Sequence, residues 1–455
     1  MKKIKDDFGD RGKKHPFKND YNIIKKITFA FLMFTILYIN TISYANIDDN
    51  EIIDVDEIKK ETIETVAKNA DELKLNARVG LIFDRNSKTI LYEKNGLKQV
   101  PMASTTKIMT AIVVLENSNL NDIVTISKKA AGTGGSRLGL KANDKITVHD
   151  LLYGLMLKSG NDAAVALAEH VGGGIEGFAD LMNKKASEMG LINSHFVTPH
   201  GLDQEKHYTT AYELACMADY ALNIPKFKEV VNSKSYNITI NARSSLIGNT
   251  NELLGNLNGV YGVKTGFTNG AGRCLVTACK RNDLDIITIV LGADTKKIRT
   301  LDSIKLIEYA YKNYEVIDIE KNIKEQFENW KYLNEKRIYI NKAKQKNIDL
   351  EIENLDYSKI AVKRTDIDNV KIEINSLYYL EAPVEEGRVI GSAKVQIAGK
   401  TIANLSIKNK QIIEKKNIFD YFIDFLSLVP WLFYENLLLG KNDNPIIKEP
   451  TTENN

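Results

Sequence analysis

Three short motifs contain residues whose side chains could carry out acyl transfer. The first, Ser104-Thr105-Thr106-Lys107, places a hydroxyl and an amine three residues apart, and on a helix such a pair shares one face. A serine hydroxyl becomes a good nucleophile only when a neighbouring base removes its proton. Lysine can be that base when burial and nearby positive charge lower its pKa. The motif predicts Ser104 as nucleophile and Lys107 as general base, although Ser-x-x-Lys alone also arises by chance.

A second motif, Ser159-Gly160-Asn161, precedes another apolar helical stretch. Its serine offers a second hydroxyl that could relay a proton to a leaving amine, and the Asn161 amide both donates and accepts hydrogen bonds. The alternative interpretation is helix capping by Ser159 or Asn161, because both residue types are favoured at helix N-termini. Taken alone, the motif leaves catalysis and capping open.

A third motif, Lys264-Thr265-Gly266, ends an apolar strand-like run. A cation and a hydroxyl at a strand end suit a substrate carboxylate, and glycine lets a substrate backbone approach as an added strand would. Taken alone, this tripeptide is equally typical of an ordinary strand-to-turn junction. The three motifs in this order, however, match the signature shared by class A β-lactamases and penicillin-binding proteins.

The wider sequence resembles the serine D-alanyl-D-alanine carboxypeptidases of the low-molecular-mass penicillin-binding class over about residues 75–410. The stretches that carry this resemblance surround the motifs and recur near the C-terminus: Pro101–Lys107, Leu157–Ala164, His200–Asp203, His207–Tyr212, Gly262–Thr268, Glu381–Val384 and Gly387–Gly391. The resemblance implies a penicillin-binding/β-lactamase-like catalytic domain of α/β (α+β) type and a small all-β C-terminal domain. It also implies removal of the terminal D-alanine from peptidoglycan stem pentapeptides and inhibition by β-lactam antibiotics. No metal is expected, because the histidines show no His-x-His or His-Glu-x-x-His spacing, and the hydroxyl and lysine chemistry requires no cofactor.

The resemblance also implies a role for each motif residue. One set would be catalytic and comprises the acylated nucleophile, its general base and a proton-relay hydroxyl: Ser104, Lys107 and Ser159. The other set would bind substrate: Asn161, Lys264, Thr265, Gly266 and Phe267. Lys264 and Thr265 would hold the terminal carboxylate, and the N–H groups of Ser104 and Phe267 would form the oxyanion hole. Such N–H donors stabilise the transition state by about 3–4 kcal/mol.

The chain departs from the relatives in two places. Some of them carry an arginine in an Asn-Arg-Asn stretch, whereas this chain has Asn249-Thr250-Asn251. A guanidinium that holds the substrate carboxylate is therefore not expected there, and whether Arg273 substitutes stays open. Some relatives also carry histidine in place of Phe267, where only the backbone N–H is needed.

A β-lactamase is the nearest alternative, because it shares the acylation chemistry. Class A β-lactamases deacylate with the help of a glutamate in a Glu-x-x-Leu-Asn stretch, and no such stretch occurs between Asn161 and Lys264. The sequence therefore favours the carboxypeptidase. A second alternative is an inactive penicillin-binding scaffold of the cell wall, whose silence would have to come from site geometry.

The N-terminus is typical of an exported protein. Several lysines precede an apolar run from Ile27 to Ile42, and small residues follow at Ser43 and Ala45, so residues 1–45 are predicted to be a signal peptide. An uncleaved anchor is the alternative, because the run approaches the length that spans a bilayer. We expect the enzyme at the extracytoplasmic face of the cell membrane or in the cell wall. A net charge of only +3, without a basic stripe, gives no indication of nucleic-acid binding.

The remaining chain divides by residue pattern into a leader and two domains. Residues 46–75 are acidic and lysine-rich and are predicted to be a leader before the folded body. A strand hairpin, a block of apolar helices, further strands and a closing helix predict a catalytic domain over residues 76–315. Alternation of polar and apolar residues then predicts a separate all-β domain over residues 316–410.

The final segment, residues 411–455, contains an aromatic and aliphatic stretch from Ile418 to Leu439. Its acidic residues fall along one helical edge, and the pattern predicts an amphipathic helix that lies in a membrane surface. Pro430, which would kink the helix, and the acidic character of the polar edge oppose this interpretation. A helix packed against the β domain is the alternative.

Overall fold

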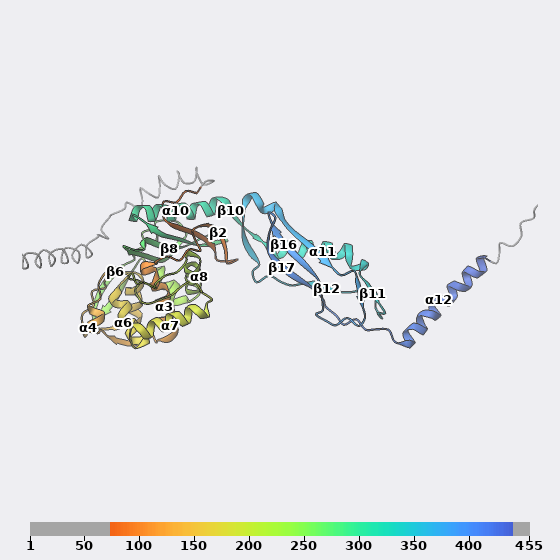
Figure 1. The fold of residues 1–455 in the computed structure, drawn as a ribbon, viewed down its shortest axis with the longest axis horizontal. Helices are drawn as coiled ribbons and strands as arrows, with labels where there is room; N and C mark the ends of the chain where they lie inside the picture. The colour runs from red at the N-terminus through yellow and green to blue at the C-terminus, as the bar shows by residue number, and fades with distance from the viewer. Residues whose placement is uncertain (1–72, 440–455) are drawn as a thin grey trace, which may run out of the picture.

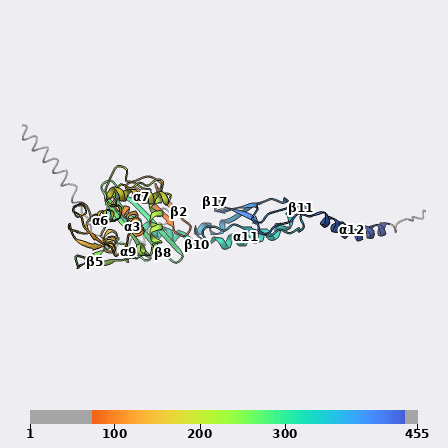
Figure 2. The same ribbon diagram turned by 90° about the horizontal axis from the view of Figure 1, so that it is seen from below.

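The computed structural model describes residues 73–439, with side chains described up to residue 428. The predicted signal peptide, nearly all of the predicted leader and the end of the C-terminal segment lie outside these residues. A larger domain, a smaller β-rich domain and a terminal helix follow one another along the long axis of the molecule (Figure 1). A view turned by 90° shows the same order (Figure 2).

The larger domain is built on one antiparallel sheet of five strands, in the order β2-β1-β9-β8-β7. β1 and β2 form the predicted hairpin, and the other three strands return from a distant part of the chain. Strand β7 is at the edge of the sheet and has no further strand neighbour among the described residues. The strands are β1 (Val79–Asp84), β2 (Thr89–Lys94), β7 (Val260–Thr268), β8 (Gly272–Arg281) and β9 (Leu284–Ala293).

Helices cover both faces of this sheet. Helix α10 (Lys296–Asn313) packs on one face, and a block of helices packs on the other (Figure 1). The block consists of η1 (Ala103–Thr106), α3 (Lys107–Asn117), α4 (Lys128–Ala131), α5 (Val148–Met156), α6 (Asn161–Gly172), α7 (Ile175–Glu188), α8 (Ala211–Leu222) and α9 (Pro225–Val231). Two strand pairs flank it: β3 (Ile123–Thr125) with β4 (Lys145–Thr147), and β5 (Ser235–Ile240) with β6 (Arg243–Gly248). The α/β architecture predicted from the sequence is confirmed.

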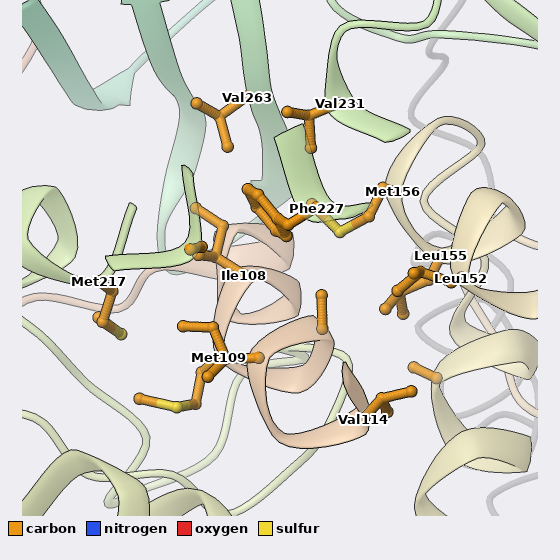
Figure 3. Close-up of a cluster of buried hydrophobic side chains, with 14 of the residues drawn as sticks. Ile108, Met109, Val114, Leu152, Leu155, Met156, Met217, Phe227, Val231 and Val263 are labelled. Carbon is orange, nitrogen blue, oxygen red and sulfur yellow. The ribbon is translucent and has the colours of Figure 1, made fainter. Parts of the chain in front are cut away.

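Helix α3 lies in the middle of the helical block. All residues of Lys107–Val114 are buried, as in a helix that is surrounded on every side. Figure 3 shows Ile108 of α3 among apolar side chains that include Phe227 of α9 and Val263 of β7. Burial of its apolar surface therefore fixes α3, and the first residue of α3, Lys107, is carried into the interior with it.

The second domain is β-rich, as predicted, but it also contains a helix. The expectation of a wholly β region from residue 316 missed α11 (Ile319–Asn334), whose Ile319, Ile323 and Phe327 are buried at four-residue spacing. That spacing marks one face of a helix, but the charged residues between these positions obscured it. The main sheet is antiparallel in the order β12-β17-β16-β14, and two strand pairs, β10-β13 and β11-β15, accompany it. The strands are β10 (Tyr314–Asp318), β11 (Tyr339–Asn341), β12 (Leu350–Ile352), β13 (Lys359–Lys363), β14 (Val370–Ser376), β15 (Tyr379–Glu381), β16 (Val389–Ile397) and β17 (Lys400–Asn409).

The last helix, α12 (Ile418–Leu439), has the bounds of the predicted amphipathic stretch. It points away from the β-rich domain in both views (Figures 1 and 2). Its large apolar side chains up to residue 428 are exposed, which does not fit a helix packed against the β domain: Ile418, Phe419, Tyr421, Phe422, Ile423, Phe425, Leu426 and Leu428. Within residues 73–439, no helix combines the length and the apolar character needed to cross a membrane.

Candidate active site

The first motif forms a tight turn at the start of α3. Ser104 lies in the 3₁₀ turn η1, and Lys107 is the first residue of α3. The turn begins at Ala103, whose φ of +50° is uncommon for a residue other than glycine. A side chain closes it, because Thr106 Oγ1 donates to the Ala103 carbonyl at 2.8 Å. Ser104 is half-buried, so its hydroxyl is presented from a rigid turn and stays accessible.

The Lys107 amine is fully buried among three oxygen atoms. Its Nζ lies 2.8 Å from Ser104 Oγ, 2.7 Å from Asn161 Oδ1 and 3.0 Å from the His200 carbonyl oxygen. A neutral amine has two N–H donors and one lone pair. When Asn161 and His200 accept the two N–H bonds, the lone pair faces the Ser104 hydroxyl. The arrangement therefore allows Lys107 to accept the proton of Ser104.

The surroundings of Lys107 favour its neutral form. Burial has the largest effect and lowers the pKa of the Lys107 amine well below its ordinary value of 10.5. The positive charge of Lys264 lowers this pKa further, whereas the Asp162 carboxylate acts in the opposite direction. Desolvation prevails because none of Lys107 is exposed to solvent, and burial penalises the charged form.

The second motif is at the start of α6, where side chains tie a loop to the helix. Asn161 Nδ2 donates to the Gly134 carbonyl at 2.8 Å, which directs its Oδ1 towards Lys107. The neighbouring Asp162 carboxylate is fully buried. It accepts hydrogen bonds at 2.8–3.0 Å from the backbone N–H groups of three loop residues: Leu138, Gly139 and Leu140. The Asn161 amide is thus held in one orientation by the loop that Asp162 anchors.

Ser159 does not cap α6. The helix is preceded by Gly160, and no side chain caps its first turn. Ser159 is buried and has a left-handed backbone conformation, with φ of +62°. A non-glycine residue in this conformation is strained and persists only where its surroundings impose it, and such residues cluster at functional sites. The capping interpretation of the second motif is therefore wrong for Ser159.

The third motif lies on the edge strand β7. Lys264 is buried, and its Nζ donates to the Thr265 carbonyl at 3.0 Å. The Thr265 hydroxyl lies 2.7 Å from the Thr250 hydroxyl, and the Thr250 N–H donates to the Leu157 carbonyl at 3.1 Å. Thr250 thus joins β7 to the segment just before Ser159. Thr250, the central residue of Asn249-Thr250-Asn251, contacts the third motif through its hydroxyl.

Gly266 is the point where β7 meets the nucleophile turn. A Cβ atom at this position would lie 3.0 Å from the Ser104 nitrogen and 3.1 Å from the Ala103 Cβ. Glycine is needed for so close an approach. The backbone of β7 therefore lies against the turn that carries the Ser104 N–H, as an oxyanion hole between Ser104 and Phe267 requires. The Arg273 guanidinium stacks 4.1 Å from the centre of the Phe267 ring.

Two functional contacts were missed by the sequence analysis. The His200 carbonyl holds the Lys107 amine, and the Asp162 carboxylate holds the loop beside Asn161. The His200 carbonyl could not be recognised from residue type, because every residue has a carbonyl. The only sign in the sequence is the glycine that follows it, since a Cβ atom at Gly201 would lie 1.9 Å from the Ala103 oxygen. No cluster of three or more His, Cys, Asp or Glu side chains that could hold a metal ion occurs in residues 73–439.

A half-buried serine hydroxyl in a turn beside a buried lysine amine, packed against an antiparallel sheet, is the arrangement expected of a serine acyl-transferase. The profile of the family described as D-alanyl-D-alanine carboxypeptidase matches residues 64–295. The profile of the penicillin-binding protein 5 C-terminal domain matches residues 328–415. The chain is 32% identical over 366 residues to the D-alanyl-D-alanine carboxypeptidase DacF of Bacillus subtilis, with 79% of this chain and 90% of DacF covered.

Other similar proteins belong to the same class. DacC, a D-alanyl-D-alanine carboxypeptidase of Escherichia coli, is 31% identical, with 78% of this chain and 88% of DacC covered. The crystal structure of penicillin binding protein 5 from Haemophilus influenzae is 28% identical, with a TM-score of 0.62, and 75% of this chain and 98% of that chain are covered.

The chain belongs to the D-alanyl-D-alanine carboxypeptidase family. It is a serine-type carboxypeptidase and a low-molecular-mass penicillin-binding protein, and it acts on cell-wall peptides outside the cytoplasm. The activity and the fold predicted from the sequence are confirmed, and of the predicted location the extracytoplasmic side is confirmed.

A substitution of Gly266 by alanine tests the contact between β7 and the nucleophile turn. The added methyl group would push β7 away from Ser104 and widen the expected oxyanion hole. Relief of this contact needs a shift of a few tenths of an ångström, so we expect the rate of covalent labelling by a fluorescent penicillin to fall several-fold, less than the roughly 10²-fold cost of a misplacement of about 1 Å. Gly248→Ala is the matched control, because a Cβ atom there would meet nothing within 4 Å. Labelling of Gly266→Ala at the control rate would contradict the close approach.

Proposed function

We propose that Ser104 attacks the carbonyl carbon of the penultimate D-alanine of the stem peptide while Lys107 removes the hydroxyl proton. The observation that carries this assignment is the 2.8 Å contact between Lys107 Nζ and Ser104 Oγ in a site without solvent around the amine. The attack forms a C–O bond, and the carbonyl oxygen gains negative charge. The N–H groups of Ser104 and Phe267 stabilise that charge, and each such donor contributes about 3 kcal/mol.

Collapse of this intermediate breaks the peptide bond and releases D-alanine. The leaving nitrogen needs a proton, and in this scheme the buried Ser159 hydroxyl relays it from the Lys107 ammonium. The second motif supports this role, because its Asn161 amide contacts Lys107. The acyl group remains on Ser104 as an ester. Water then attacks the ester, with Lys107 again as the base, and the shortened stem peptide leaves with a new carboxylate.

The third motif orients the substrate for this attack. The Lys264 cation and the Thr265 hydroxyl bind the carboxylate of the terminal D-alanine at the open edge of the sheet. The substrate backbone lies along β7 beside Gly266, where no side chain obstructs it. Lys264 has a second effect, because its charge lowers the pKa of Lys107. One cation thus binds the substrate and helps to keep the base neutral.

A Ser104→Ala variant tests the nucleophile. It can form no acyl-enzyme, so release of D-alanine from a pentapeptide should fall by roughly 10⁶-fold, as when other serine nucleophiles are removed. Labelling by a fluorescent penicillin should disappear as well. The matched control is Ser187→Ala, since Ser187 is exposed on α7 and should label normally. Intact labelling of the Ser104→Ala variant would show that another residue is acylated.

We infer further that α12 binds the enzyme to the extracytoplasmic membrane surface. Its exposed apolar side chains follow one another along a single helix and are not scattered singly over the surface. Contiguous exposed apolar patches mark interaction sites. Lys415 and Lys416 precede the helix and suit the headgroups of anionic lipids. A helix that lies in the plane of the membrane surface does not have to be long enough to cross the bilayer.

Truncation tests this membrane contact. A mature chain that begins at residue 46 and ends at Asn417 should stay folded and active but should no longer sediment with anionic vesicles. A chain from residue 46 to Leu439, which keeps α12, is the matched control and should sediment. Should the chain that ends at Asn417 still sediment, the lipid contact lies elsewhere in the protein.

A further inference from the structure

Residues 195–208 form a loop under the nucleophile turn, which we name the support loop. The loop begins and ends at an antiparallel bridge between His195 and Tyr208. Its tip meets the turn and α3 at three points: Thr110 Oγ1 donates to the Pro199 carbonyl at 2.6 Å, Lys107 Nζ donates to the His200 carbonyl at 3.0 Å, and Gly201 lies against the Ala103 carbonyl. The position of the nucleophile turn therefore depends on this loop.

His207 makes a fourth contact, and its tautomer follows from its partners. Its Nδ1 accepts a hydrogen bond from the Val197 N–H at 3.0 Å, so Nδ1 carries no proton. The proton of the neutral ring is therefore on Nε2, which donates to Thr106 Oγ1 at 2.8 Å. The Thr106 hydroxyl can then donate only onwards, to the Ala103 carbonyl at 2.8 Å. The result is a directed chain of hydrogen bonds that ends at the Ala103 oxygen.

The Ala103 carbonyl matters because it shares a peptide plane with the Ser104 N–H. The atoms of a trans peptide lie in one rigid plane, with the oxygen and the N–H on opposite sides. An interaction that fixes the Ala103 oxygen therefore also fixes the direction of the Ser104 N–H. Ala103 needs such support, because its left-handed backbone conformation is unfavourable for alanine.

We propose that His207 is a positioning residue for the reaction: acting through the Thr106 hydroxyl and the Ala103 carbonyl, its Nε2–H orients the Ser104 N–H as an oxyanion-hole donor. The inference rests on the proposed role of Ser104. His207 and Thr106 touch neither the substrate nor the attacking oxygen in this scheme. Their effect falls on the transition state, where the oxyanion donor is needed, and not on the initial binding of substrate.

The environment of His207 keeps the ring in the required form. Burial first, and then nearby His195, lower the pKa of His207 to about 4, while Asp203 acts in the opposite direction. The ring is therefore neutral at pH 7. Phe196 packs edge-on against it, with ring centres 5.9 Å apart. A neutral, enclosed ring keeps one tautomer and hence one direction of donation.

Two substitutions of His207 separate its two hydrogen bonds. In His207→Gln, the side-chain nitrogen reaches the place of Nε2 and can still donate to Thr106. In His207→Asn, the side-chain oxygen stands near the place of Nδ1, so the bond from Val197 is kept and the bond to Thr106 is lost. The measurement is the stopped-flow acylation of the purified mature enzyme by a penicillin, which yields a binding constant and a saturating rate constant. Thermal unfolding is followed in parallel.

We expect the saturating acylation rate of His207→Asn to fall about ten-fold or more, a part of the 10²–10³-fold cost of losing an oxyanion donor. Its penicillin binding constant should be unchanged. Thr106→Val should show the same defect, and His207→Gln should stay near the wild-type rate. His170→Asn is the control, because His170 is at the far end of α6 and contacts Asp122.

Three results would overturn the inference: a wild-type rate for His207→Asn, an equal loss in His207→Asn and His207→Gln, or a loss that appears only in the binding constant. Peptide mapping of the penicillin adduct keeps this test distinct from that of the proposed function. An adduct on a residue other than Ser104 in the wild-type enzyme would overturn the proposed nucleophile itself.

Discussion

The proposed mechanism depends on keeping the amine of one lysine uncharged inside a protein core. An ammonium ion at Lys107 would need three acceptors and would lose its hydration, and burial makes that form costly. The structure supplies two firm acceptors, Asn161 Oδ1 and the His200 carbonyl, and leaves the Ser104 hydroxyl as the third neighbour. Two acceptors suit a neutral amine, which then has a lone pair for the serine proton. Most other features of the site serve to hold these groups in place.

The groups come from segments that are far apart in the chain and are brought together by packing. The nucleophile turn leads into α3, which is enclosed by apolar side chains (Figure 3). The support loop and the edge strand β7 meet this turn or its lysine through backbone atoms, and the loop near Gly134 reaches the lysine through the Asn161 amide. Because α3 cannot shift inside a close-packed core, the distances that govern proton transfer are set by the fold and not by flexible side chains.

Much of the architecture and the motif residues could be predicted from the sequence, because apolar periodicity and residue type report on both. The hairpin of β1 and β2 and the bounds of α12 are examples. The His200 carbonyl could not be predicted, since any residue type can present a carbonyl. The left-handed conformation of Ser159 was also hidden, because tertiary contacts impose it. The roles of Thr250 and Asp162 depend on which distant backbone groups they meet, and no local pattern reports that.

The most direct test of the central claim is the pKa of the Lys107 amine itself. Enzyme labelled with ¹³C at the lysine Cε carbons can be titrated by NMR, and the Lys107 signal is the one that is missing from Lys107→Met. A lowered pKa means that the amine loses its proton, and becomes a competent base, at a pH well below 10.5. The Lys107 signal should therefore titrate far below those of the exposed lysines. A Lys107 signal that titrates together with them would contradict a neutral lysine base.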